Sequence, residues 1–298
     1  MTFRCEGTFT ALVTPMRDDH DRSLDLDALE RLVEQQIAGG VDGLVACGTT
    51  GEAATLSDDE WAEVIRRSRQ FAAGRVPVVA GTGSNDTRKA IAQSQKAEQL
   101  GADALLVVTP YYNKPTQAGL VAHFTAVADA VRTPVILYNV PGRTGCNMLP
   151  ATVAELAKHP NVVGLKEASG SLDQVIETVG RTGGAFPVLS GEDGLCVPMY
   201  SVGCKGVISV VSNPAPALTA ALYRDFVAGR TRDAGRGQVA LHNLIKVLFS
   251  EPNPQPAKMA MHLLGVMAPV ARLPLLTATP ATREALLREL TTLGLASA

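Results

Sequence analysis

The strongest constraint on the fold is a unit that recurs along the chain. A short β-branched run ends in Gly, Thr, Asn or Pro, and a longer segment of helical period follows it. The unit occurs eight times within roughly the first 230 of 298 residues. The runs are apolar throughout, which is typical of a parallel sheet covered on its faces. We expect the strands within residues 9–15, 43–51, 77–83, 104–110, 134–140, 162–168, 187–193 and 206–213.

Eight strand–helix units predict an α/β fold of the (β/α)8 TIM-barrel type, for which about 250 residues is typical. A doubly wound open sheet is the alternative, but it usually has fewer strands, and the first strand here lacks a GxGxxG turn. After Gly229 the pattern is helical only. We therefore expect a barrel over residues 1–229 and a small C-terminal all-helical appendage over residues 230–298. Ser57 with Glu60, and then Asn85, are the expected starts of two barrel helices.

Composition excludes several classes of partner. The net charge is -2, and aromatic residues make up 4% of the chain, so neither a nucleic-acid surface nor a polybasic membrane patch is expected. No apolar run reaches the ~18 residues that a spanning helix needs, and the N-terminal segment does not resemble a secretory signal. The five cysteines are scattered without a CxxC pair, which fits reduced thiols in a cytoplasmic protein.

The stretch "VVGLKEASG", residues 162–170, carries the most informative polar residue. It places Lys166 near the end of a buried strand, and in this fold the chemistry lies at the carboxyl ends of the strands. Burial disfavours the charged form of an amine, and a neutral lysine amine can form a Schiff base with a carbonyl compound. The alternative is a structural lysine that extends to the rim or pairs with Glu167.

Polar residues at other strand ends extend this interpretation. Tyr138 ends the neighbouring strand, and its phenol, with a hydroxyl of Thr49 or Thr50, could relay the protons that imine chemistry requires. The alternative for Tyr138 is a core aromatic whose hydroxyl is satisfied. Arg143, in the turn "VPGRTG", suits bidentate binding of a carboxylate, although an exposed surface arginine is the alternative.

Metal-dependent chemistry is not expected. None of the five histidines falls at a predicted strand end, and no two have the spacing of metal ligands. The residues therefore favour carbonyl chemistry through an imine, with no cofactor.

Seven motifs occur in order and at the expected intervals: "GTTGEAATLS", "AGTGSN", "VTPYYNKPTQAGL", "LYNVPGRTG", "GLKEASG", "LSGED" and "GVISV". On these motifs the chain resembles the dihydrodipicolinate synthase family, within the pyruvate-dependent class I aldolases. The resemblance runs from about Gly7 to the C-terminus and includes "EPNPQPAK". It implies that pyruvate, held covalently as an imine, condenses as an enamine with L-aspartate 4-semialdehyde, in diaminopimelate and lysine biosynthesis. Ring closure then releases the product.

The resemblance also implies roles for catalytic residues. Lys166 resembles the lysine that forms the Schiff base with pyruvate. Tyr138, Thr49 and Tyr112 resemble a proton relay in which the second tyrosine, here Tyr112, reaches the active site of a neighbouring subunit. A homotetramer, arranged as a dimer of dimers, is the usual assembly of this family and is expected here.

Four further residues resemble substrate-binding positions. Thr50 resembles a residue that binds the pyruvate carboxylate, and Arg143 one that binds the carboxylate of L-aspartate 4-semialdehyde. Gly191 and Ile208 resemble backbone positions that line the pocket.

Regulation is expected to depart from part of the family. Members inhibited by L-lysine tend to carry a glutamate where this chain has Lys89, and a histidine or similar polar group where it has Trp61. Asn85 and Tyr111 remain. Lys89 would face an incoming ammonium, and two like charges ~4 Å apart at a dielectric near 20 cost on the order of 4 kcal/mol. We expect inhibition by L-lysine to be weak or absent.

Two competing functions stay open at this point. N-acetylneuraminate lyase and the 2-keto-3-deoxy-sugar aldolases share the lysine and the tyrosine, but Arg143 and Tyr112 fit a short carboxylated aldehyde better than a sugar chain. A barrel that binds a keto acid without catalysis is the other alternative, and it would need no proton relay.

Overall fold

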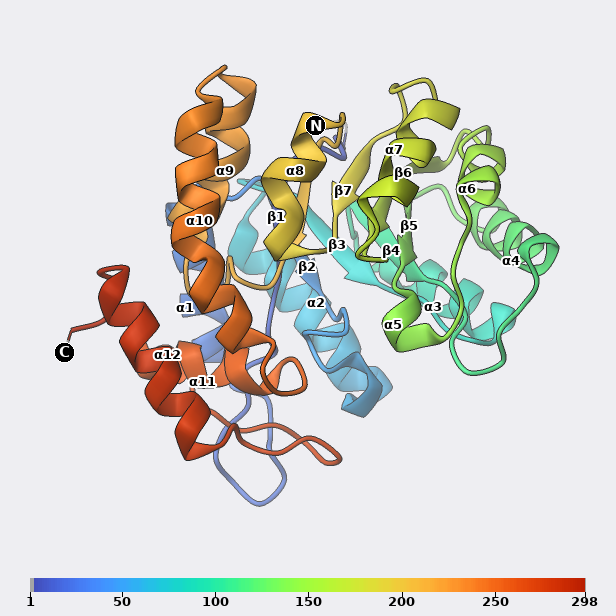
Figure 1. Cartoon of the computed structure of the whole chain (residues 1–298). Coiled ribbons are helices and arrows are strands. Elements are labelled where there is room, and N and C mark those ends of the chain that lie inside the picture. The colour runs from blue at the N-terminus through green and yellow to red at the C-terminus, as the bar shows by residue number, and fades with distance from the viewer. Residues whose placement is uncertain (1–2, 298) are drawn as a thin grey trace.

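The computed structural model describes residues 3–297 and contains a closed barrel of eight parallel strands, paired in sequence order (Figure 1). The predicted barrel is confirmed. The first strand begins at Gly7, two residues before the predicted start, and ends at Ala11. The strands are β1 (Gly7–Ala11), β2 (Gly43–Ala46), β3 (Val78–Gly81), β4 (Ala104–Val108), β5 (Val135–Asn139), β6 (Val162–Glu167), β7 (Val188–Ser190) and β8 (Gly206–Ser209).

Helices follow the strands and surround the barrel. The main ones are α1 (Leu26–Ala38), α2 (Asp58–Ala72), α3 (Thr87–Gln99), α4 (Gln117–Asp129), α6 (Pro150–Leu156), α7 (Leu172–Arg181), α8 (Cys196–Ser201) and α9 (Pro216–Val227). Three short ones lie in the loops above the strands: the 3-10 helices η1 (Ala53–Thr55) and η2 (Asp193–Leu195), and the single turn α5 (Pro141–Thr144).

One of the two predicted helix starts is confirmed and one is wrong. Ser57 and Glu60 form a capping box at α2, in which each side chain accepts a hydrogen bond from the other residue's backbone N–H. At α3 the cap is Asp86, not Asn85, because Asp86 directly precedes the first helical residue and its carboxylate accepts from the N–H of Arg88 at 2.9 Å. Asn85 instead offers its backbone carbonyl to the side chain of Asn113.

The strands are buried on both faces, as their continuous apolar character predicts. One hydrophobic cluster fills the barrel interior and includes Phe9, Val79 and Ile136. A second lies between the barrel and the helices and includes Leu44, Leu105 and several helical side chains. The strand frame is therefore fixed from inside and outside, and side chains at its carboxyl ends are held on a rigid base.

Three helices complete the chain after Gly229, with no strand among residues 230–297: α10 (Thr231–Leu248), α11 (Gln255–Leu263) and α12 (Pro280–Thr292). Figure 1 shows α10 alongside α9, with α11 and α12 beyond it. Side chains of all three join the cluster that also contains the barrel helices. The boundary at Gly229 stays a prediction, since the two regions share this core. Within the described residues, no helix combines the length and apolar character needed to cross a membrane.

Candidate active site

Two adjoining cavities open at the carboxyl ends of the strands. The inner cavity, of about 70 Å³, is lined by Lys166 together with polar residues from four other segments. The outer cavity, of about 530 Å³, leads to it and shares Thr49, Tyr138, Arg143 and Asn253 with it. The polar residues that line the inner cavity are Thr49, Thr50, Tyr138, Arg143, Lys166, Glu192 and Asn253.

Lys166 and Tyr138 lie side by side on neighbouring strands. Their Cα atoms are partners in the β5–β6 register, and Lys166 Nζ lies 4.4 Å from the centroid of the Tyr138 ring. The lysine is only 6% exposed and Tyr138 only 7%, yet both line the inner cavity. The Tyr138 ring thus lies against the amine, and the face of an aromatic ring attracts an ammonium group.

Glu167 points away from this cavity, because successive side chains of a strand face opposite sides. Its carboxylate accepts hydrogen bonds from Asn139, Gln174 and the backbone of Ser169. Burial raises the pKa of this carboxyl, and the hydrogen bonds oppose that rise. The alternative of a Lys166–Glu167 ion pair is therefore wrong.

Gly191 leaves room for the lysine stem. A Cβ atom at this position would lie 2.6 Å from Ala168 Cβ and 3.1 Å from Lys166 Cε. Its N–H donates to the backbone carbonyl of Glu167 at 2.7 Å, so the loop after β7 lies directly against the end of β6. The prediction for Gly191 as a lining position agrees with this geometry.

Ile208 is expected to line the pocket through its backbone, and this stays a prediction. Its side chain is buried in the barrel interior, and it is not among the residues that line either cavity. Val210, two residues further along the chain, lines the inner cavity instead.

The predicted carboxylate-binding residues lie on loops. Thr50 is buried, and its Oγ1 accepts a hydrogen bond from Asn253 Nδ2 at 2.9 Å. Arg143, on the single turn α5, is exposed and lines both cavities. A guanidinium at the mouth and a hydroxyl deeper inside could each hold a different carboxylate.

The expected proton relay of Tyr138, Thr49 and Tyr112 is not assembled within one chain. Tyr138 and Thr49 line the same cavities, but no hydrogen bond links them among residues 3–297. Tyr112 lines neither cavity. Its side chain is 88% exposed, its φ of +74° lies in the left-handed region, and its N–H donates to the carbonyl of Thr144.

Glu192 and Asp193 lie near the amine, but sequence reasoning gave them no role. The motif "LSGED" could have indicated them, because it places both directly after a predicted strand. Glu192 lines the inner cavity, and burial raises the pKa of its carboxyl, with the charge of Asp193 adding to that rise. Asp193 is buried and accepts from the N–H groups of Val210 and Val211 at 2.9 and 3.0 Å. It thereby fixes the segment that follows β8.

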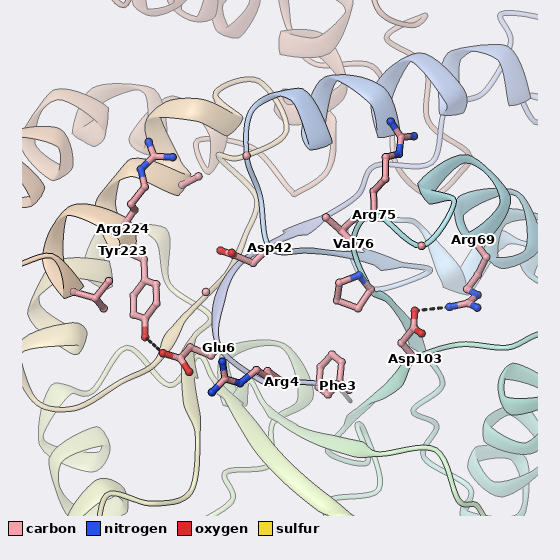
Figure 2. A pocket seen from close by; sticks show the side chains of 16 residues that line it. Phe3, Arg4, Glu6, Asp42, Arg69, Arg75, Val76, Asp103, Tyr223 and Arg224 are labelled. Carbon is pink, nitrogen blue, oxygen red and sulfur yellow. Dashed lines mark hydrogen bonds and ion pairs between the residues drawn. The ribbon is translucent and has the colours of Figure 1, made fainter. Parts of the chain in front are cut away.

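A third cavity, of about 790 Å³, lies at the opposite end of the barrel (Figure 2). Its residues include Gly7, Asp42 and Asp103, which stand at or just before the starts of strands. Two pairs of its lining residues contact each other: Tyr223 donates to Glu6, and Arg69 pairs with Asp103. Lys166 lies at the other end of the barrel, so this cavity is not the candidate active site.

Comparison with known proteins agrees with this arrangement. The sequence profile of the dihydrodipicolinate synthetase family matches residues 4–293. The 4-hydroxy-tetrahydrodipicolinate synthase of Pelobacter propionicus is 49% identical over 97% of this chain and 99% of its own. The crystal structure of dihydrodipicolinate synthase from Thermotoga maritima superposes with a TM-score of 0.95, at 41% identity over 99% of this chain and 100% of its own. The chloride-inhibited Acinetobacter baumannii enzyme, solved in complex with pyruvate, also gives 0.95, at 42% identity over 98% and 100% of the two chains.

Proposed function

The chain belongs to the dihydrodipicolinate synthetase family, and from this premise we propose that it acts as a 4-hydroxy-tetrahydrodipicolinate synthase, a lyase of diaminopimelate and lysine biosynthesis. Its substrates are pyruvate and L-aspartate 4-semialdehyde. The observation that carries the proposal is the buried amine of Lys166 beside the Tyr138 ring, at the inner end of a cavity open to small molecules.

The first half of the reaction forms an imine. Lys166 Nζ attacks C2 of pyruvate, a C–N bond forms, and the carbonyl oxygen leaves as water after protonation. Tyr138 is the nearest phenol and supplies and recovers protons, with Thr49 as its hydroxyl partner and Tyr112 as the further member of the relay. Thr50 binds the pyruvate carboxylate. No cofactor is required beyond this covalent intermediate.

The second half joins the substrates. Loss of a methyl proton converts the imine to an enamine, whose carbon attacks the aldehyde carbon while Arg143 holds the semialdehyde carboxylate. The amino group of the semialdehyde then attacks the imine carbon, the bond to Lys166 breaks, and the ring closes. One water leaves in total, as imine formation requires.

The size of the inner cavity favours pyruvate, a short oxo acid. A volume of about 70 Å³ corresponds to roughly five water-sized spheres. Three-carbon pyruvate suits that space, and the outer cavity is then left for the acceptor. We also infer that the protein is a cytoplasmic homotetramer, and the exposed side chain of Tyr112 supports the assembly. We further infer weak or absent inhibition by L-lysine, which is supported by Lys89 in the wall of the outer cavity.

Borohydride trapping tests the chemistry. Reduction in the presence of pyruvate is expected to add the mass of the reduced pyruvate imine to the wild-type chain and to leave Lys166→Ala unmodified. A coupled assay then compares L-aspartate 4-semialdehyde with N-acetylmannosamine as acceptors, and we expect turnover with the former. Absence of an adduct would favour a keto-acid sensor, and faster turnover of the sugar would favour the sialic-acid lyase branch.

A further inference from the structure

The Thr50 hydroxyl is held by a residue from the far end of the chain. Asn253 lies 203 positions later, between α10 and α11, and its Nδ2 donates to Thr50 Oγ1 at 2.9 Å. Both residues are buried and both line the inner cavity. Asn253 is therefore placed to influence how Thr50 meets a ligand.

This hydrogen bond decides whether the Thr50 hydroxyl donates or accepts toward a ligand. A hydroxyl has one proton to donate and two lone pairs that accept, whereas an amide NH2 group can only donate. Since Asn253 occupies a lone pair of Oγ1, the Thr50 proton is directed elsewhere. An ionised carboxylate only accepts, so a hydroxyl committed to donating is the matching partner for it.

A buried ion pair anchors the segment of Asn253 to the loop of Thr50. Lys258, on α11, pairs with Glu52, and their side chains are 0% and 1% exposed. Lys258 Nζ also donates to the carbonyl of Val270 at 2.9 Å, and Glu52 Oε2 accepts the N–H of Arg272 at 3.1 Å. Removing one partner of a buried pair leaves an uncompensated charge, so substitution of either residue is expected to disturb both segments.

The backbone of Glu52 supports the same interpretation. Its φ of +53° lies in the left-handed region, where glycine is favoured and a longer side chain is strained. A glutamate at this position is explained by what its carboxylate binds, and the ion pair offsets the strain. The loop of Thr50 thus takes its shape partly from the C-terminal helices.

We propose that Asn253 is a positioning residue that commits the Thr50 hydroxyl to donating to the pyruvate carboxylate, and that the Glu52–Lys258 pair holds it in place. The inference rests on the proposed function, because it takes Thr50 as the group that binds this carboxylate.

Steady-state kinetics of Asn253 variants test the proposal. Asn253→Ala removes one hydrogen bond, so the KM for pyruvate is expected to rise roughly tenfold while kcat stays within about threefold. Asn253→Asp is isosteric, but its carboxylate would accept the Thr50 proton and repel the substrate. Its KM is expected to rise further, by about a hundredfold. A merely structural asparagine would instead lower the melting temperature and the active fraction with KM unchanged.

Asn161→Ala is the matched control. Asn161 lies just before β6 and lines neither active-site cavity; its side chain donates to the backbone carbonyls of Ala128, Val131 and Thr133, which precede β5. This variant is expected to lose stability with an unaltered pyruvate KM. Should Asn253→Ala fail to fold, the isosteric Asn253→Asp decides the question.

The ion pair is tested by removing one charge or both. Glu52→Gln and Lys258→Met are each expected to raise the pyruvate KM. The double variant is expected to recover part of the loss, because no unpaired charge remains. Unchanged KM in both Asn253 variants, beside a normal Lys166-dependent adduct in the wild type, would overturn the proposal. A wild type without that adduct would instead refute the proposed function.

Discussion

At the scale of single residues, the Lys166 amine proposed as the nucleophile has one neighbour that leaves room for it and one that can exchange protons with it. Tyr138 presents its ring to Lys166 Nζ, and Gly191 leaves the space beside the lysine stem. Each contact can be removed by one conservative change.

Tyr138→Phe keeps the ring beside the amine and removes the hydroxyl. We expect turnover to fall by roughly 10²- to 10⁴-fold, the usual contribution of a general acid–base group. The melting temperature should stay the same, since the phenol oxygen makes no hydrogen bond among residues 3–297. Rapid-quench measurement of borohydride-trapped imine checks the first step. A rate equal to that of the wild type would show that the phenol carries no proton there.

Gly191→Ala fills the space beside Lys166. The added methyl group would lie too close to Ala168 Cβ, and overpacking of this kind costs about 1–3 kcal/mol. Urea unfolding and the rate of imine formation are both expected to show the loss. The double variant Gly191→Ala/Ala168→Gly, which removes the opposing methyl group, should recover most of the stability. If the double variant does not regain stability, the strain does not come from the contact between the two methyl groups.

The residues of the site were predictable where a strand ended in a polar side chain. Lys166 and Tyr138 fit this rule because the strand period fixes the level and direction of their side chains. Gly191 follows a strand and came from the family resemblance alone. Ile208 was expected to line the pocket through its backbone; its side chain is buried in the barrel interior, and Val210 lines the inner cavity. Asn253 was missed since its contact with Thr50 spans 203 positions and depends on how α10 and α11 pack.

At the scale of elements, the start of α2 is joined to the C-terminal region by charge. Glu60 belongs to the α2 capping box and also accepts two hydrogen bonds from the guanidinium of Arg272. Arg272 additionally donates to the backbone carbonyls of Thr55 and Arg22. Three segments therefore meet at one guanidinium.

The Glu60–Arg272 pair makes the free energy of unfolding depend on pH. The hydrogen bonds from Arg272 lower the pKa of Glu60 from 4.5 to about 2. Because the folded-state pKa is the lower one, the stabilisation is complete above about pH 4.5 and is lost as the pH falls through about 2. We expect Glu60→Gln to cost on the order of 2 kcal/mol at pH 7 and progressively less as the pH falls to 3.

Urea unfolding of the wild type and Glu60→Gln between pH 7 and pH 3 checks this difference. Glu177→Gln is the control, since its pair with Arg181 is exposed and is worth little. A constant difference between the wild type and Glu60→Gln at every pH would contradict the assigned pKa.

The elements themselves were largely readable from the sequence. Continuous apolar runs predicted the strands, and the capping box at Ser57 predicted the start of α2. The start of α3 was misplaced by one residue because Asn85 and Asp86 are both good caps, and only the backbone conformation decides between them. How the C-terminal helices contact the loop of Thr50 could not be predicted, since it depends on packing between distant segments.

At the scale of the whole molecule, Tyr112 leads to a test of assembly. Its exposed side chain lines neither of the two active-site cavities, and we propose that it completes a neighbour's site. Tyr112→Phe and Lys166→Ala are each expected to be nearly inactive alone. If the relay crosses subunits, unfolding and refolding them together in equal amounts should restore about a quarter of the wild-type activity through mixed dimers.

Analytical ultracentrifugation of the same mixture checks that mixed oligomers form. Activity that stays at the level of the separate variants, in a mixture shown to be associated, would mean that Tyr112 serves its own chain.

Regulation gives a second test at this scale. Lys89 and Tyr111 line the outer cavity, whereas Trp61 is buried and donates its indole N–H to the carbonyl of Gly81. We expect isothermal titration with L-lysine to show no binding in the micromolar range, because Lys89 repels an incoming ammonium. Lys89→Glu reverses that charge and is expected to gain affinity. Micromolar binding by the wild type would refute the prediction.

The proposed nucleophile lies on a strand and the proposed carboxylate-binding residues lie on loops, which has a consequence for redesign of substrate specificity. The nucleophile stands on β6, packed from both sides of the barrel wall, while Arg143 and Thr50 come from segments that follow strands. Substitutions confined to α5 and to the outer rim leave the amine's own support untouched. A library built there can search for new acceptor aldehydes while every member retains the same covalent chemistry toward pyruvate.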